Sequence, residues 1–169
     1  KLGHRASVID GPCHASRTLR SCRGQTAGII HKWIMTTIES KHVEIGKGAQ
    51  DLYTFLQDMN NFQQLLPKER ISEWKSDGTS CSFKVQGAAT IGLQLDGGTA
   101  PSHVRLKATD RSPFPFTLDV HLNENNGTTE AWQVFNGEIN PFIKMMVEKP
   151  LKNLFDHISD KMLAIHGGI

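Results

Sequence analysis

The 169-residue sequence predicts an α+β domain in which a curved antiparallel sheet of about six to seven strands wraps around a long C-terminal helix. Apolar residues alternate with polar residues over roughly residues 71–139, which is typical of strands with one dry and one wet face. Two short stretches of helical spacing precede these strands. A wide apolar stripe of helical spacing follows them, from residue 143 to about residue 165.

The first elements lie between Ile38 and Pro67. Residues 38–45 alternate and end at a glycine, so we predict the first strand there. Apolar residues then recur at three- and four-residue spacing over residues 49–62, which predicts an amphipathic helix. Asn60–Asn61 indicates a break, and Pro67 ends a second short helix.

The strands that follow are separated by the turn signals Asp77–Gly78, Asp96–Gly97–Gly98 and Asn125–Asn126–Gly127, which favour a meander. The parity of the last strand, residues 128–139, is ambiguous from its own pattern of apolar residues. Asn140–Pro141 then predicts the capped start of the last helix.

Residues 1–34 differ from the rest of the chain. They carry six basic residues and one acid, a formal charge of +5, whereas the other 13 basic and 16 acidic residues sum to −3. They lack any repeat, so we predict an unstructured leader or expression-derived segment, with a transit peptide as the alternative, and a domain over residues 35–169. Because the domain carries no basic excess, we expect no nucleic-acid partner.

Composition also indicates the cellular compartment in which the protein is expected. No apolar run reaches the ~18 residues of a membrane span, and the first residues lack the apolar central segment that is typical of a secretory signal. The three cysteines, Cys13, Cys22 and Cys81, are too few and too scattered for a disulfide framework. A reducing compartment, and hence a cytoplasmic protein, is expected. The sequence does not indicate an oligomeric state.

Three local motifs complete the pattern: the run from Leu56 to Phe62 that continues to Pro67, Phe135-Asn136-Gly137, and Asn140-Pro141-Phe142. With these motifs and this element order, roughly residues 36–166 resemble the START-like superfamily. It is also called SRPBCC or Bet v 1-like, and includes polyketide cyclase/dehydrase and lipid transport proteins. The resemblance implies a helix-grip fold and the binding of lipids, sterols, hormones or polyketides. Alignment of Gly137 with the family also implies that Ala131 and Phe135 of the last strand face inward. It also implies two minority roles, cyclase and chaperone activator.

A sheet that curls around one helix encloses a space lined by its inward side chains. We therefore predict a cavity for an apolar small molecule or lipid, with these ligand-binding residues: Phe83, Val85, Ile91, Leu93, Leu95, Val104, Leu106, Phe116, Leu118, Val120, Gln133, Phe135, Met145 and Met146. A filled core needs the same residues, so the sequence leaves open whether any volume remains. Gln133 would orient a ligand head group or bond to neighbouring backbone or water.

Candidate catalytic groups are sparse. Asp119 and His121 could form an acid–base pair, but they alternate with apolar residues and should face water. His157 and Asp160 should form an exposed pair on the last helix. No phosphate loop, nucleophile elbow or compact zinc motif occurs. We predict no catalytic residue, metal or cofactor, and a binding module. The alternatives are a cyclase- or hydratase-like enzyme and a partner-binding module like a chaperone activator.

Overall fold

The computed structural model describes residues 34–87 and 89–167. The predicted leader lies outside these residues, except for Ile34, which starts the first strand. The elements follow in this order: β1 (Ile34–Glu39), β2 (Val43–Ile45), α1 (Ala49–Leu56), α2 (Met59–Leu65), β3 (Ile71–Ser76), β4 (Ser80–Val85), β5 (Thr90–Thr99), β6 (His103–Ala108), β7 (Phe116–Asn125), β8 (Thr128–Ile139) and α3 (Pro141–His166).

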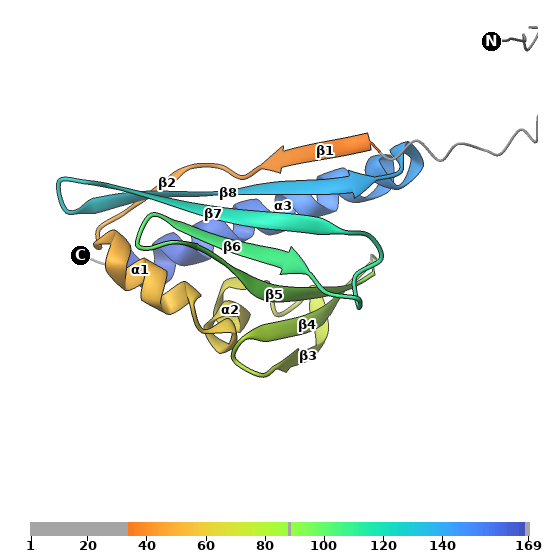
Figure 1. The fold of residues 1–169 in the computed structure, drawn as a ribbon, viewed down its shortest axis with the longest axis horizontal. Coiled ribbons are helices and arrows are strands. Elements are labelled where there is room, and N and C mark those ends of the chain that lie inside the picture. Colours follow the sequence, from red (N-terminus) through yellow and green to blue (C-terminus); the bar gives the residue numbers. More distant parts are fainter. Residues whose placement is uncertain (1–33, 88, 168–169) are drawn as a thin grey trace, which may run out of the picture. The chain divides into compact units, whose positions relative to one another are not determined.

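The strands form one antiparallel sheet of eight strands in the order β1-β8-β7-β6-β5-β4-β3, and β2 also pairs with β8. Figure 1 shows α3 running along one face of this sheet, with α1 and α2 after β2. The predicted helix-grip architecture is confirmed. The predicted strand count was too low because the first strand is divided in two.

The break between β1 and β2 has a specific cause at Ser40. The Ser40 hydroxyl accepts a hydrogen bond from the Gln133 backbone N–H at 2.9 Å, and the Ser40 N–H donates to the Gln133 carbonyl at 2.9 Å. The Ser40 side chain thus binds a backbone N–H that would donate to a backbone carbonyl in a regular strand pair. Pairing with β8 resumes only at Val43.

The break between the helices also differs from the prediction. It falls at Gln57–Asp58 instead of Asn60–Asn61. Asp58 caps α2, since its carboxylate accepts a hydrogen bond from the Asn60 N–H at 2.9 Å. Asn61 lies inside α2, and its side-chain amide donates to the Phe55 carbonyl at 3.2 Å. Pairs of asparagines suit turns and caps, but here the aspartate before them supplies the cap.

Curvature of the sheet arises partly at a bulge in β5. The pairing register with β6 shifts between Leu95 and Gly98, and a bulge increases the local twist of a strand. Gly98 has a φ of 136°, and a Cβ there would collide with the backbone carbonyl of His103. This position therefore requires glycine.

The inward faces of the strands and one side of α3 form the core. Ala131 and Phe135 are buried, which confirms the predicted parity of β8. The buried residues of α3 are confined to its second part: Leu151, Leu154, Phe155, Ile158, Ser159, Met162 and His166. The Asn140 side chain caps α3 by accepting from the Phe142 N–H at 2.9 Å, as predicted. Within residues 34–87 and 89–167, no helix has the length and apolar character needed to cross a membrane.

Candidate ligand site

The space between the sheet and the second part of α3 is almost completely filled. Its internal cavity has a volume of about 20 Å³, enough for roughly one water molecule. It is lined by Phe62, Leu66, Phe83, Ile91, Leu93, Phe114, Phe116, Leu118, Phe135, Leu151, Leu154, Phe155 and Ile158. Six predicted ligand-binding residues line it: Phe83, Ile91, Leu93, Phe116, Leu118 and Phe135. In this structure they act as core residues.

A larger apolar hollow, of about 370 Å³, lies beside the first part of α3. We call it the α3 pocket, and it is lined by Val85, Gly87, Ala89, Ile91, Pro113, Phe114, Ile143, Met146, Val147, Pro150, Leu151 and Leu154. Small-molecule sites commonly measure roughly 300–1,000 Å³ and have mostly apolar walls. The α3 pocket fits both descriptions.

Three parts of the chain build this pocket: the β4–β5 hairpin, the segment between β6 and β7, and α3. The segment between β6 and β7 is anchored on β5 at Gly92. The Gly92 N–H donates to the Ser112 hydroxyl, which in turn donates to the Gly92 carbonyl, each at 2.9 Å. A Cβ at Gly92 would collide with Thr109. The glycine therefore allows the close approach that presents Pro113 and Phe114 to the pocket.

The pocket contains only part of the predicted residue set. Val85, Ile91 and Met146 line it, whereas Leu95, Val104, Leu106 and Val120 line neither hollow. Met145 has an exposed fraction of 82% and also lines neither, so its predicted role in the wall is wrong. A helix turns by about 100° per residue, and this rotation carries Met145 outward while Met146 and Val147 face the pocket.

Several pocket residues were missed from the sequence, namely Gly87, Ala89, Pro113, Phe114, Ile143, Pro150, Leu151 and Leu154. The sequence around Phe114 could have indicated its burial, because a large aromatic side chain between two prolines in a connecting segment is expected to pack against the core. It is buried against Phe116 and Phe135, with ring centroids 5.8 and 6.4 Å away.

Gln133 does not reach the α3 pocket. Its side chain is 1% exposed, and its amide donates to the Ser159 hydroxyl at 3.3 Å. The Ser159 hydroxyl donates onward to Ser40 at 3.1 Å and also reaches the Lys41 carbonyl at 3.2 Å. Gln133 thus links β8, α3 and the β1–β2 connection. Of the two roles left open by the sequence, the structure favours bonding to neighbouring protein groups.

Asp119 and His121 lie on the outer face of the sheet, as the alternation predicted. Asp119 is nevertheless buried there and not exposed to solvent. Its exposed fraction is 6%, and its carboxylate accepts from His103 Nε2 at 2.7 Å and from Arg105 Nε at 2.8 Å. Burial alone would raise the pKa of Asp119, but the hydrogen bonds from Arg105 and His103 outweigh it and hold the pKa below its ordinary value.

His121 is part of a stack of rings across the outer face. Its ring centroid lies 5.0 Å from that of His103 and 5.0 Å from that of Trp132, which in turn stacks on His42 at 4.6 Å. Burial, followed by the nearby His103, lowers the pKa of His121. Asp119 therefore bonds to Arg105 and His103 instead of His121, and the two do not form the acid–base pair that the sequence left as a candidate.

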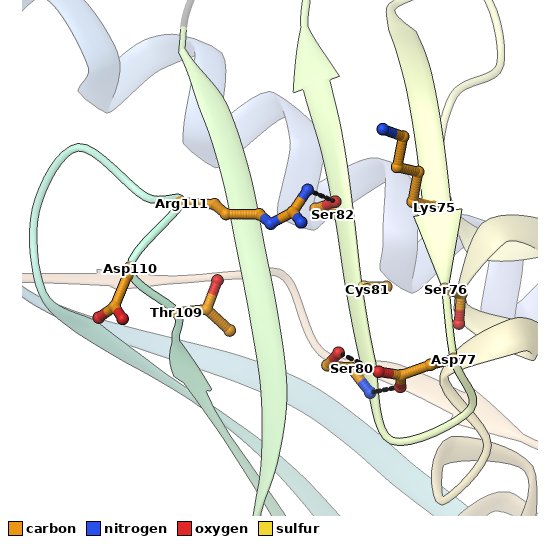
Figure 2. A pocket seen from close by; sticks show the side chains of 9 residues that line it. All are labelled: Lys75, Ser76, Asp77, Ser80, Cys81, Ser82, Thr109, Asp110 and Arg111. Atoms are coloured by element: carbon orange, nitrogen blue, oxygen red, sulfur yellow. Dashed lines mark hydrogen bonds between the residues drawn. The ribbon is translucent and has the colours of Figure 1, made fainter.

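A third hollow, which is polar and has a volume of about 390 Å³, opens near the β3–β4 turn (Figure 2). Arg111 reaches the Ser82 hydroxyl there at 3.5 Å, while Asp77 accepts from the backbone N–H of Ser80 at 2.6 Å. The hydrogen bonds of the turn lower the pKa of Asp77 to about 2. Burial raises the pKa of the Cys81 thiol to about 12, so this cysteine is not a thiolate nucleophile at neutral pH.

Two of the three comparisons with known proteins found no match: no family model fits the chain, and no curated protein sequence matches it. Solved structures do match. A START superfamily protein from Mycobacterium smegmatis has a TM-score of 0.54 at 12% identity, over 78% of this chain and 98% of its own. Ara h 8.0201 has a TM-score of 0.51 at 13% identity, over 78% of this chain and 99% of its own.

Norcoclaurine synthase from Thalictrum flavum, in complex with dopamine and hydroxybenzaldehyde, has a TM-score of 0.57. It is 14% identical and covers 95% of this chain and 98% of its own. At such identities a structural match shows the fold alone. The chain has the START-like, Bet v 1-like fold that the sequence resemblance implied.

Proposed function

We propose that this protein binds an apolar small molecule or lipid in the α3 pocket. The observation that carries the proposal is an apolar hollow of about 370 Å³ at one end of an otherwise filled core. Removing an apolar ligand from water would contribute roughly 25 cal/mol for each Å² of buried apolar surface. This site lies beside the first part of α3, whereas the sequence predicted a site in the interior.

The pocket walls favour binding over catalysis. All twelve lining residues are apolar or glycine, so within the described residues no carboxylate, imidazole or amine forms part of the wall. General acid–base catalysis needs such a group within hydrogen-bond reach of the reacting atoms. Norcoclaurine synthase shares the fold, but nothing in this pocket supports the transfer of its activity to this chain.

The neutral dye Nile red tests the proposal. Its fluorescence should rise and saturate on addition of the native protein. Val147→Trp should weaken binding at least about tenfold, because it inserts an indole into the pocket and a loss of that size needs only about 1.4 kcal/mol. Met145→Trp is the matched control, since it adds the same ring two residues away on the exposed side of α3, and it should leave binding unchanged.

Two outcomes would contradict the proposal. The first is the absence of saturable Nile red binding by the native protein. The second is equal loss of binding in Val147→Trp and Met145→Trp, which would place the dye on the exposed helix surface instead of in the pocket. Thermal unfolding of both variants checks that each remains folded.

A further inference from the structure

A polar groove adjoins the α3 pocket. It has a volume of about 320 Å³ and lies between the segment after α2, the end of β4 and the middle of α3. Val85, Pro150 and Leu154 line both hollows. The two spaces are therefore adjacent at these three side chains, and one has apolar walls whereas the other carries polar groups.

Arg70 supplies the positive charge of this groove. Its backbone is fixed on both sides, because its N–H donates to the Pro67 carbonyl at 2.9 Å and its carbonyl accepts from the Gln86 N–H at 2.8 Å. Its side chain forms no ion pair within residues 34–87 and 89–167, even though Glu69 lines the same groove. The guanidinium thus has five N–H donors available for a ligand.

His157 lines the same groove from α3. The sequence predicted an exposed pair between His157 and Asp160, but Asp160 pairs with Lys41 instead. His157 is half-buried, and its Nε2 atom is buried with no hydrogen-bond partner among the described residues. Burial, followed by the charge of Lys161, lowers the pKa of His157, so its ring is largely neutral at neutral pH. Because Nε2 is buried, a ligand oxygen in the groove reaches it only after the His157 ring turns, and it accepts a hydrogen bond there when Nε2 carries the proton.

We infer that the two hollows form one amphipathic site, in which the α3 pocket holds the alkyl chain of a fatty-acid-like ligand and the groove binds its carboxylate at Arg70 and His157. This inference rests on the proposed function and adds the ligand class. A carboxylate suits Arg70 because a guanidinium binds its two oxygens by charge-assisted hydrogen bonds. The carboxylate of Glu69 lines the same groove and repels a ligand carboxylate. The positive charge of Arg70 should therefore determine whether an acid binds more tightly than an alcohol of equal length.

Competition between Nile red and two ligands tests the inference. Lauric acid and 1-dodecanol share a chain length and differ in the head group. Arg70→Gln should weaken lauric acid binding about 10- to 100-fold, as expected for the loss of a charge-assisted hydrogen bond, and leave dodecanol unchanged. Lys68→Gln removes an exposed positive charge outside the groove and should change neither affinity.

A second variant tests the role of His157. His157→Phe keeps an aromatic ring but removes Nε2, so it should weaken lauric acid more than dodecanol. The inference is overturned if Arg70→Gln weakens both ligands equally, or if Lys68→Gln weakens lauric acid as much as Arg70→Gln does. The proposed function fails by a different result, in which neither ligand displaces Nile red from the native protein.

Discussion

Leu93→Trp distinguishes a filled interior from an empty one. Leu93 is buried at the cavity of about 20 Å³, which cannot accept an indole without displacing its neighbours. Overpacking of this kind costs roughly 1–3 kcal/mol. In a domain of this size, that cost corresponds to a fall of about 3–15 °C in the midpoint of thermal unfolding.

The matched variant places the same ring in the larger hollow. Val147→Trp inserts its indole into a space of about 370 Å³, so we expect a change in stability within about 0.5 kcal/mol, as for most surface substitutions. Urea unfolding followed by circular dichroism measures both variants. If Leu93→Trp were as stable as the native protein, or if Val147→Trp lost more stability than Leu93→Trp, the assignment of filled and open space would be wrong.

Other substitutions test the remaining contacts. Asp119→Asn should cost about 1.5–3 kcal/mol in urea unfolding because it weakens charge-assisted hydrogen bonds, whereas the exposed control Asp110→Asn should cost little. The pKa of Asp119 is lower in the folded protein than in the unfolded chain. Its contribution to the free energy of unfolding is therefore fully present above the unfolded pKa of about 4 and is lost as pH falls through the folded pKa. A cost independent of pH over that range would contradict this account. Gln133→Ala should lower stability by about 1–3 kcal/mol with Nile red affinity unchanged, and weakened dye binding in the folded variant would argue against a purely structural role. Gly98→Ala should cost more than about 1 kcal/mol and more than Gly97→Ala, which has a positive φ but open space around it; equal costs would exclude the collision with His103.

The sheet was predictable because its signals are local. A side chain's face depends only on its position along the strand, so Phe83 and Leu93 were placed inward from alternation alone. The cap at Asn140 was likewise read from two adjacent residues. The break at Ser40 was not predictable in this way, because it depends on Gln133, a residue 93 positions away.

The burial of Asp119 required the register between strands. Alternation placed it correctly on the outer face but could not reveal that Arg105 lies directly opposite on β6. The same register places His103 opposite His121, where it also reaches the Asp119 carboxylate. An outward side chain is therefore exposed only when its cross-strand neighbours are short or point away.

The location of the pocket could not be read from the spacing of apolar residues. Ile143, Val147, Leu151 and Leu154 all belong to one helical stripe, yet the first two are half-buried and the last two are buried. The difference depends on which side chains of the sheet and its connecting segments lie opposite each residue of α3, and this is a property of the assembled fold. Periodicity gives the side of a helix that faces inward but not its distance from the sheet.

The division between filled and open space also limits the shape of a ligand. Ile91, Phe114, Leu151 and Leu154 line both the α3 pocket and the small internal cavity, and so form the wall between them. Access to the interior would require Phe114 to leave its packing against Phe116 and Phe135, at a cost comparable to exposing a buried aromatic side chain, roughly 1.5–3 kcal/mol. In the proposed site, a narrow ligand extends from the α3 pocket past Val85 into the Arg70 groove and leaves Phe114 in place, whereas a rigid ring system too wide for the α3 pocket would have to displace this wall. If the proposed site is correct, an extended chain should therefore bind more tightly than a fused ring system of equal apolar area.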